Sequence, residues 1–161
     1  MPDIFVGLGS NIEPEANLRA ALLALRREFG ELRCSSVYRS PAFGFVGPEF
    51  LNMVVGFFSD LGVDALELRL SALENARGRG AGERRGSRTI DLDLLLYGKR
   101  VDAGRRLPRA DVLGYPFVLA PLAEIAPELV HPITGIPLRV AWSAIADRVD
   151  TLRLVGALDA A

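Results

Sequence analysis

The sequence predicts a single α+β domain over residues 1–161, with a ferredoxin-like split β-α-β core and a mainly antiparallel sheet flanked by helices. Hydrophobic periodicity indicates the order strand, helix, strand, strand, helix, strand, followed by further helices. The chain is long enough for one sizeable core, and its content of 50% hydrophobic and 24% charged residues is typical of globular proteins.

The first half supplies a strand, a helix and two more strands. We expect a buried strand at 4–9, a helix at 14–29, a strand at 32–39 and a strand at 50–58, with a loop at 40–48. The helix carries apolar residues at helical spacing, begins with a proline that suits a first turn, and is followed by a glycine that suits a C-terminal cap. These residues are Leu18, Leu22, Leu25 and Phe29, with Pro14 and Gly30 at the ends.

The second half completes the split pattern. A helix at 64–77 precedes a strand at 88–97, and a turn at 97–101 leads into a short strand. Leu66, Leu70 and Leu73 form the buried side of that helix. The remaining elements are a short helix at 116–127 bounded by prolines, an amphipathic helix at 138–149 and an edge strand at 152–155.

Charge and composition exclude several classes of function. The net charge of −1 provides no global attraction for nucleic acid, and no apolar run approaches the roughly 18 residues of a membrane span. The single cysteine, Cys34, excludes an internal disulfide and is expected to be a small core residue. The only histidine, His131, lies in a turn, which argues against a Ser-His-Asp triad. We expect a cytoplasmic monomer without a signal peptide.

The strand at 88–97 carries a pair of carboxylates. Side chains alternate between the two faces of a strand, so Asp91 and Asp93 share one face, about 6.6 Å apart along the strand. Ile90, Leu92 and Leu94 face the other way and can enter a core. Two carboxylates on one face repel each other and resist burial, so a positive group is expected between them. Alternatively, one Asp is exposed or paired with an arginine.

An arginine-rich, glycine-rich segment precedes this strand. Arginine suits bidentate contacts to phosphate, and glycine at this density indicates a loop. On its own such a loop is more often a solvated hairpin, but beside the acid pair it favours a Mg²⁺-polyphosphate site. Its arginines are Arg77, Arg79, Arg84, Arg85 and Arg88. Glu74, at the end of the preceding helix, is either a salt-bridge partner or a site residue.

Several motifs, in order along nearly the whole chain, resemble the 6-hydroxymethyl-7,8-dihydropterin pyrophosphokinase family. The motifs are Gly9-Ser10-Asn11, Tyr38-Arg39-Ser40-Pro41, Phe50-Leu51-Asn52, Gly86-Ser87-Arg88-Thr89-Ile90-Asp91-Leu92-Asp93 and Phe117-Val118-Leu119-Ala120-Pro121-Leu122, followed by Glu124-Ile125-Ala126-Pro127. The resemblance implies transfer of pyrophosphate from ATP to the pterin hydroxymethyl group in folate biosynthesis, with release of AMP and two Mg²⁺ ions.

The resemblance also implies roles for individual residues. Asp91 and Asp93 would bind the metals, and Arg79, Arg84 and Arg88 would act with Asp93 in catalysis. The pterin would be bound by Ser40, Pro41, Ala42, Phe43, Phe50, Asn52 and Phe117. ATP would contact Glu74, Arg79, Arg84, Arg88, Leu94, Arg106 and Arg109. A flat heteroaromatic ring suits stacking between Phe50 and Phe117, and the Asn52 amide can pair with its edge. Otherwise Asn52 is a satisfied edge-strand amide.

The chain departs from the family pattern at four notable positions. Arg85 stands where the family usually has Trp, Ser87 where it has Pro, Arg109 where it has His, and Tyr115 where it has Arg. These changes affect the phosphate side more than the pterin side. One alternative function is therefore a pterin-binding family member with weak or lost kinase activity. Another is an RNA-binding module, which the net charge and the absence of an aromatic RNA-binding strand motif disfavour.

Overall fold

The computed structural model describes residues 1–77 and 88–158. Its strands are β1 (Asp3–Ser10), β2 (Arg33–Cys34), β3 (Val37–Ser40), β4 (Phe50–Phe58), β5 (Asp91–Tyr97) and β6 (Arg153–Gly156). Its helices are α1 (Pro14–Phe29), α2 (Val63–Ala76), α3 (Asp111–Gly114), α4 (Pro116–Ile125) and α5 (Leu138–Ile145), with short 3₁₀ turns at Ala103–Arg105 and Ala146–Arg148. The predictions for Arg79, Arg84, Arg85 and Ser87 concern positions outside the described residues.

The strands form one sheet in the order β5-β1-β4-β3-β6, and β2 also pairs with β4. Every pairing between these strands is antiparallel. The chain thus places its first strand between the third and fourth strands of the split β-α-β pattern, as that topology requires. The predicted α+β class with a ferredoxin-like core is confirmed.

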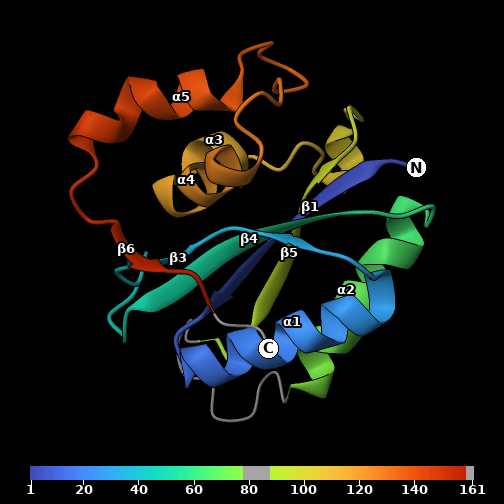
Figure 1. The fold of residues 1–161 in the computed structure, drawn as a ribbon, viewed down its shortest axis with the longest axis horizontal. Helices are drawn as coiled ribbons and strands as arrows, with labels where there is room; N and C mark the ends of the chain where they lie inside the picture. Colours follow the sequence, from blue (N-terminus) through green and yellow to red (C-terminus); the bar gives the residue numbers. More distant parts are fainter. Residues whose placement is uncertain (78–87, 159–161) are drawn as a thin grey trace.

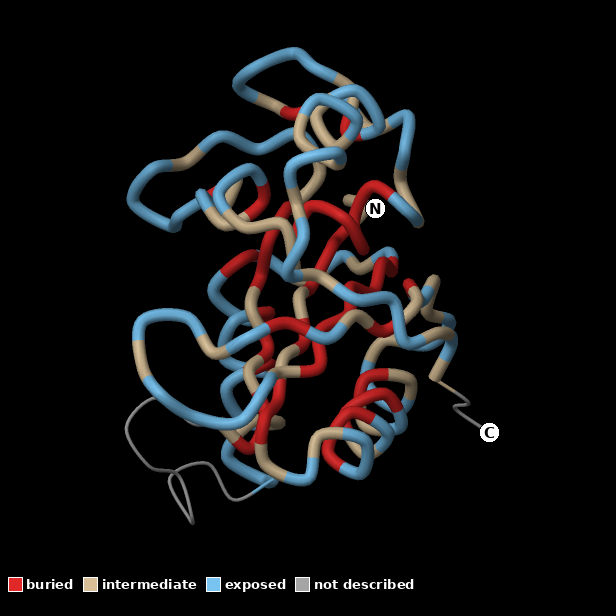
Figure 2. Tube along the Cα trace, turned by 90° about the vertical axis from the view of Figure 1, so that its left-hand side faces the viewer, coloured by how far each residue is buried: buried red, intermediate tan, exposed pale blue. Residues whose placement is uncertain are grey.

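Helices cover both faces of the sheet (Figure 1). On one face, α1 and α2 pack against a core that includes Leu8, Leu22 and Leu66, all at most 2% exposed. On the other face, α3, α4 and α5 pack against a second core that includes Phe5 and Leu122. The buried residues accordingly follow the strands and the inner sides of the helices (Figure 2). The sheet therefore separates two apolar layers.

A β-bulge in β5 gives this strand contacts with both layers. Phe5 pairs with Leu96 while the next residue, Val6, pairs with Leu94, so Leu95 is the extra residue. Leu94 is buried in the α1/α2 layer, whereas Leu95 and Leu96 are both buried in the opposite layer. The extra residue follows Leu94, so the bulge leaves the predicted alternation of Asp91, Leu92 and Asp93 intact.

The predicted strand at 32–39 is wrong as a continuous element, because it breaks at Ser35 and Ser36. Ser35 N–H donates to the Val54 carbonyl at 2.9 Å, and Ser35 Oγ accepts from Val54 N–H at 2.9 Å. The serine hydroxyl therefore replaces a backbone acceptor of the ladder and separates β2 from β3. Cys34, at the end of β2, is exposed, so its expected place in the core is also wrong.

Several other elements begin or end at residues that differ from the predicted ones. The strand expected at 88–97 begins at Asp91, and the helix expected at 138–149 ends at Ile145 before a 3₁₀ turn. The short strand expected after Tyr97 is an isolated bridge between Asp102 and Leu107. Across the two described stretches, none of the helices combines the length and apolar character needed to cross a bilayer.

Candidate active site

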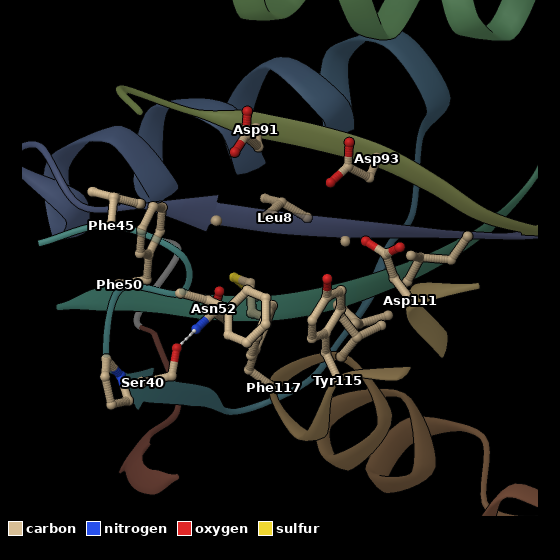
Figure 3. Close-up of a pocket in the computed structure, with 18 residues that line it drawn as sticks. Leu8, Ser40, Phe45, Phe50, Asn52, Asp91, Asp93, Asp111, Tyr115 and Phe117 are labelled. Carbon is tan, nitrogen blue, oxygen red and sulfur yellow. Dashed lines mark hydrogen bonds between the residues drawn. The ribbon is translucent and has the colours of Figure 1, made fainter. Parts of the chain in front are cut away.

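A pocket of about 240 Å³ opens on the sheet face that α3 and α4 cover (Figure 3). Its lining comes from β1, β4 and β5, from the loop between β3 and β4, and from the start of α4. The lining residues that matter most for chemistry are Ser40, Phe50, Asn52, Asp91, Asp93 and Phe117. All six were predicted to bind pterin or metal, from motifs that are widely separated in the sequence.

Two glycines of β1 form the floor of the pocket. Gly9 lies opposite Asn52 of β4 on one side and opposite Asp91 of β5 on the other. Gly7 lies opposite Val54 and Asp93 in the same way. Because neither glycine has a side chain, the central strand leaves open the space between the amide of β4 and the carboxylates of β5. Side chains of the two strands that flank β1 therefore line the pocket on either side of these glycines.

The amide side of the pocket is held by a buried hydrogen bond. Asn52 is 6% exposed, and its Nδ2 donates to Ser40 Oγ at 2.8 Å. Among the described residues no donor reaches Asn52 Oδ1, so this oxygen and the second N–H of the amide are available to a ligand. Asn52 does not lie on an edge strand, because β4 pairs with strands on both sides.

Aromatic rings form the walls. Phe50 and Phe117 both line the pocket. Phe45 packs edge-on against Phe50 with ring centroids 6.2 Å apart, and Tyr115 stacks on Phe117 at 5.0 Å and 19°. Phe43 from the β3–β4 loop contacts Tyr115 edge-on at 5.2 Å. Aromatic faces supported in this way suit a flat, conjugated ligand.

The opposite side of the pocket is acidic and is lined by the two strand aspartates. Their side chains are 28% exposed for Asp91 and 41% exposed for Asp93, so both carboxylates reach solvent. Arg88 Nε lies 3.7 Å from Asp91 Oδ1, and Arg109 Nη2 lies 3.8 Å from Asp93 Oδ1. The prediction that Asp91 and Asp93 share one face, with Leu92 and Leu94 buried behind them, is confirmed.

Arg109 bridges two carboxylates. Its Nε lies 3.3 Å from Asp111 Oδ2 but is not aligned for a hydrogen bond, so the contact is an ion pair. Burial alone would lower the pKa of Arg109, but the carboxylates of Asp93 and Asp111 outweigh burial and raise this pKa. A fixed positive charge therefore lies beside the carboxylate pair, where an anionic ligand could replace one of its partners.

The carboxylate pair suits a hard divalent cation. Mg²⁺ in phosphate-transfer sites is typically held by one or two carboxylates, with water and substrate phosphates completing the shell. Asp91 and Asp93 present oxygen ligands from one strand face toward an open pocket. No group of three or more His, Cys, Asp or Glu side chains that could hold a metal occurs within residues 1–77 and 88–158. Asp91 and Asp93 are therefore a carboxylate pair of the described chain that could hold such a cation.

Three predicted pterin contacts come from the end of β3 and the loop that follows it. Ser40, Pro41 and Phe43 line the pocket, and Ala42 lies between them in sequence without lining it. Phe43 is 68% exposed, so this side of the pocket is open to solvent.

Several predicted ATP contacts lie outside the pocket lining. Glu74 at the end of α2 accepts a hydrogen bond from Leu92 N–H at 2.9 Å and so joins α2 to β5. The Leu94 side chain is 5% exposed and faces the α1/α2 layer, on the other side of the sheet from the pocket. Arg106 is exposed, with a left-handed backbone at φ 55°.

Sequence reasoning did not assign several residues that line the pocket, among them Gly7, Gly9, Asp111 and Tyr115. Gly7 and Gly9 alternate on β1, which places both on one face, and this spacing was the available signal. Asp111 and Tyr115 lie in the segment before α4, where no periodic pattern marked them as site residues.

Comparisons with known proteins give a consistent result. Residues 5–127 match a family model described as 7,8-dihydro-6-hydroxymethylpterin-pyrophosphokinase. A 2-amino-4-hydroxy-6-hydroxymethyldihydropteridine pyrophosphokinase of Synechocystis is 45% identical over 81% of this chain and 69% of its own length. The Haemophilus influenzae protein of the same name is 37% identical over 82% and 86%, respectively.

Solved structures agree on the fold. A Plasmodium falciparum HPPK-DHPS carrying the triple mutation S436F/A437G/A613T superposes with a TM-score of 0.73 over 91% of this chain, at 11% identity. The A437G protein of the same organism gives a TM-score of 0.74 at 10% identity. The chain spans less than half the length of these structures, 44% and 46% respectively.

Proposed function

Because this chain belongs to the 7,8-dihydro-6-hydroxymethylpterin-pyrophosphokinase family, we propose that it transfers pyrophosphate from ATP to 6-hydroxymethyl-7,8-dihydropterin in folate biosynthesis. It is an ATP-dependent diphosphokinase, and ATP is its co-substrate. The observation that carries the assignment to this pocket is the pairing, across β1, of a buried amide between aromatic walls with two accessible carboxylates. A pterin ring and a polyphosphate need these two environments side by side.

The ring environment accounts for pterin recognition. A pterin edge carries alternating hydrogen-bond donors and acceptors, which match the free Oδ1 and N–H of Asn52. The hydrogen bond from Asn52 to Ser40 fixes the orientation of the amide before the ligand binds. Phe50 and Phe117 would then enclose the two faces of the ring.

The carboxylate environment accounts for phosphate handling. The pterin hydroxymethyl oxygen forms a bond to the β-phosphorus of ATP and gives up its proton to solvent, while the bond from that phosphorus to the oxygen bridging the α-phosphate breaks, so AMP leaves with the electron pair. Asp91 and Asp93 would hold Mg²⁺, which supplies charge neutralisation on the phosphates when bound. Arg88 and Arg109 would add positive charge around the phosphates. Positioning and electrostatics would supply most of the rate enhancement.

A coupled assay for AMP release tests the proposal. The wild-type chain should release AMP from ATP only when pterin and Mg²⁺ are both present. Asp93→Asn keeps the side-chain shape but removes the charge, and should lower turnover by about 100-fold or more. Asp150→Asn removes one carboxylate from an exposed position outside the pocket and should keep full activity.

Two outcomes would contradict the proposal. Equal AMP release by wild type and Asp93→Asn would refute the metal assignment. Pterin binding by calorimetry without AMP release at high Mg-ATP would instead support the alternative of a pterin-binding family member that has lost the chemistry. That alternative predicts the same aromatic and amide contacts, so only turnover separates it from the kinase.

A further inference from the structure

Tyr115 occupies a fixed position at the junction between α3 and α4. Its N–H donates to the Asp111 carbonyl at 3.1 Å, and its carbonyl accepts from the N–H groups of Val118 and Leu119, both at 3.0 Å. Its backbone is extended, at φ −130° and ψ 126°, which is the conformation that the following Pro116 favours. With both backbone groups bonded, the junction is rigid and Tyr115 lines the pocket.

The Tyr115 ring supports one wall of the pocket. It stacks on Phe117 with ring centroids 5.0 Å apart and the planes within 19°. In Figure 3, Phe117 lies between Asn52 and Tyr115, so Tyr115 covers the face of Phe117 that is turned away from the amide. Phe43 packs edge-on against the same Tyr115 ring at 5.2 Å. Tyr115 thus joins the β3–β4 loop to the start of α4.

The Tyr115 hydroxyl is available to a ligand. Figure 3 shows this end of the side chain directed toward the side of the pocket where Asp93 and Asp111 lie. No residue of the described chain forms a hydrogen bond with the hydroxyl, although a phenol that borders a partly buried pocket ordinarily finds a partner. The hydroxyl therefore lies between the ring-binding side and the carboxylate side of the pocket.

We propose that Tyr115 is a substrate-positioning residue with two separable parts. Its ring holds Phe117 flat against the pterin, and its hydroxyl hydrogen-bonds to the pterin hydroxymethyl oxygen and directs that oxygen toward the β-phosphorus. The inference rests on the proposed function, since it assumes that the pterin lies beside Asn52 with its hydroxymethyl group toward the aspartates. It assigns to this chain a contact at the point where the two substrates meet.

Two variants separate the ring from the hydroxyl. Tyr115→Phe keeps the stacking and should leave the Kd for pterin within about twofold of wild type, because water can replace the lost hydrogen bond, while kcat falls about fivefold because the hydroxymethyl oxygen is no longer directed toward the β-phosphorus. Tyr115→Ala removes the stacking as well and should raise the Kd for pterin about 2- to 13-fold. The KM for ATP should stay near the wild-type value in Tyr115→Phe.

Binding is measured by titration calorimetry with 6-hydroxymethyl-7,8-dihydropterin in the presence of Mg²⁺ and α,β-methylene-ATP, which cannot undergo the transfer. Turnover is measured by AMP release. Tyr38→Phe is the matched control, because the Tyr38 hydroxyl donates to Glu124 of α4 at 2.7 Å but Tyr38 does not line the pocket. This control should keep both kcat and the Kd for pterin.

The possible outcomes distinguish the role of the hydroxyl, the role of the ring and the proposed function from one another. A wild-type kcat in Tyr115→Phe, or a rise in its KM for ATP instead of a fall in kcat, would overturn the role of the hydroxyl. Wild-type pterin affinity in Tyr115→Ala would overturn the role of the ring. Failure of the proposed function looks different, because the wild-type chain itself would then release no AMP, while calorimetry would still test the contribution of the ring to pterin binding.

Discussion

Gly9 lies directly opposite Asn52 in the β1–β4 pairing, and a methyl group added at Gly9 would lie 3.3 Å from Asn52 Oδ1. The same methyl group would lie 3.9 Å from the Phe50 ring. The absence of a side chain at Gly9 therefore keeps open both the amide and one aromatic wall of the pocket. This relationship links a residue of the central strand to ligand recognition.

Gly9→Ala should weaken pterin binding while the fold is retained. The methyl group would displace the Asn52 amide by a few tenths of an ångström and disturb one hydrogen bond to the ligand, which corresponds to a rise in Kd of about fivefold. Calorimetry with pterin measures the effect. Gly62→Ala is the control, because a methyl group at Gly62 meets nothing within 4 Å. Unchanged affinity in Gly9→Ala would show that the ligand does not use this side of the amide.

Arg109→Ala should raise the KM for ATP and leave pterin affinity nearly unchanged. The guanidinium lies on the carboxylate side, beside Asp93 and Asp111, and a charge-assisted contact to phosphate corresponds to a loss of about tenfold or more. Steady-state kinetics at varied ATP gives KM, and thermal unfolding checks the fold. Arg139→Ala, which breaks only the exposed ion pair with Glu128, should behave as wild type. A larger effect on pterin than on ATP would contradict this assignment.

His131 should make the free energy of unfolding depend on pH. Its Nδ1 accepts hydrogen bonds from the N–H groups of Ile133 and Thr134, each at 3.2 Å, so the folded state favours the neutral ring. Burial lowers the pKa of His131 below its ordinary value of 6.5. Below about pH 6.5 the unfolded chain therefore binds a proton more readily than the folded chain. The contribution of His131 to the free energy of unfolding is fully present above this pH. It decreases as the pH falls toward the pKa of the folded state, and it is constant below that pKa.

The measurement is urea denaturation at about pH 7.5, 6.5 and 5.5, a range around the ordinary histidine pKa in which histidine is the main side chain to titrate. His131→Asn offers a side-chain oxygen as acceptor without a titratable group, so its stability should change less over this range. If the variant and the wild type lose stability in parallel, the histidine is not the source of the pH dependence.

The sequence predicted the structure best for helices and strands in which one hydrophobic periodicity dominates. The periodicity of α1 predicted its ends at Pro14 and Phe29, and β4 was predicted from Phe50 to Phe58. The alternation around Asp91 and Asp93 predicted which side chains face the pocket, because a half-buried strand has only two faces. Ser35 was not foreseen, since only the paired strand reveals that its hydroxyl bonds to the Val54 backbone.

The site was predicted as separate motifs, and the structure supplies how they meet. Asn52, Phe50 and Asp91 are distant in sequence, and β1 brings them together because it pairs with both β4 and β5. Tyr115 and Asp111 carry no periodic signal, since they belong to a junction between helices whose path depends on tertiary packing. Such residues can be recognised as part of the pocket only when the positions of the helices on the sheet are known.

The two apolar layers on opposite sides of the sheet have a practical consequence for protein engineering. The pocket opens on the α3/α4 side, whereas α1 and α2 pack on the other side of the sheet through residues such as Leu22 and Leu66. Volume-conserving substitutions on the inner sides of α1 and α2, which do not line the pocket, can therefore be selected for heat resistance without altering substrate preference. Because the sheet lies between the two layers, thermal stability and substrate preference can be optimised in separate libraries of variants.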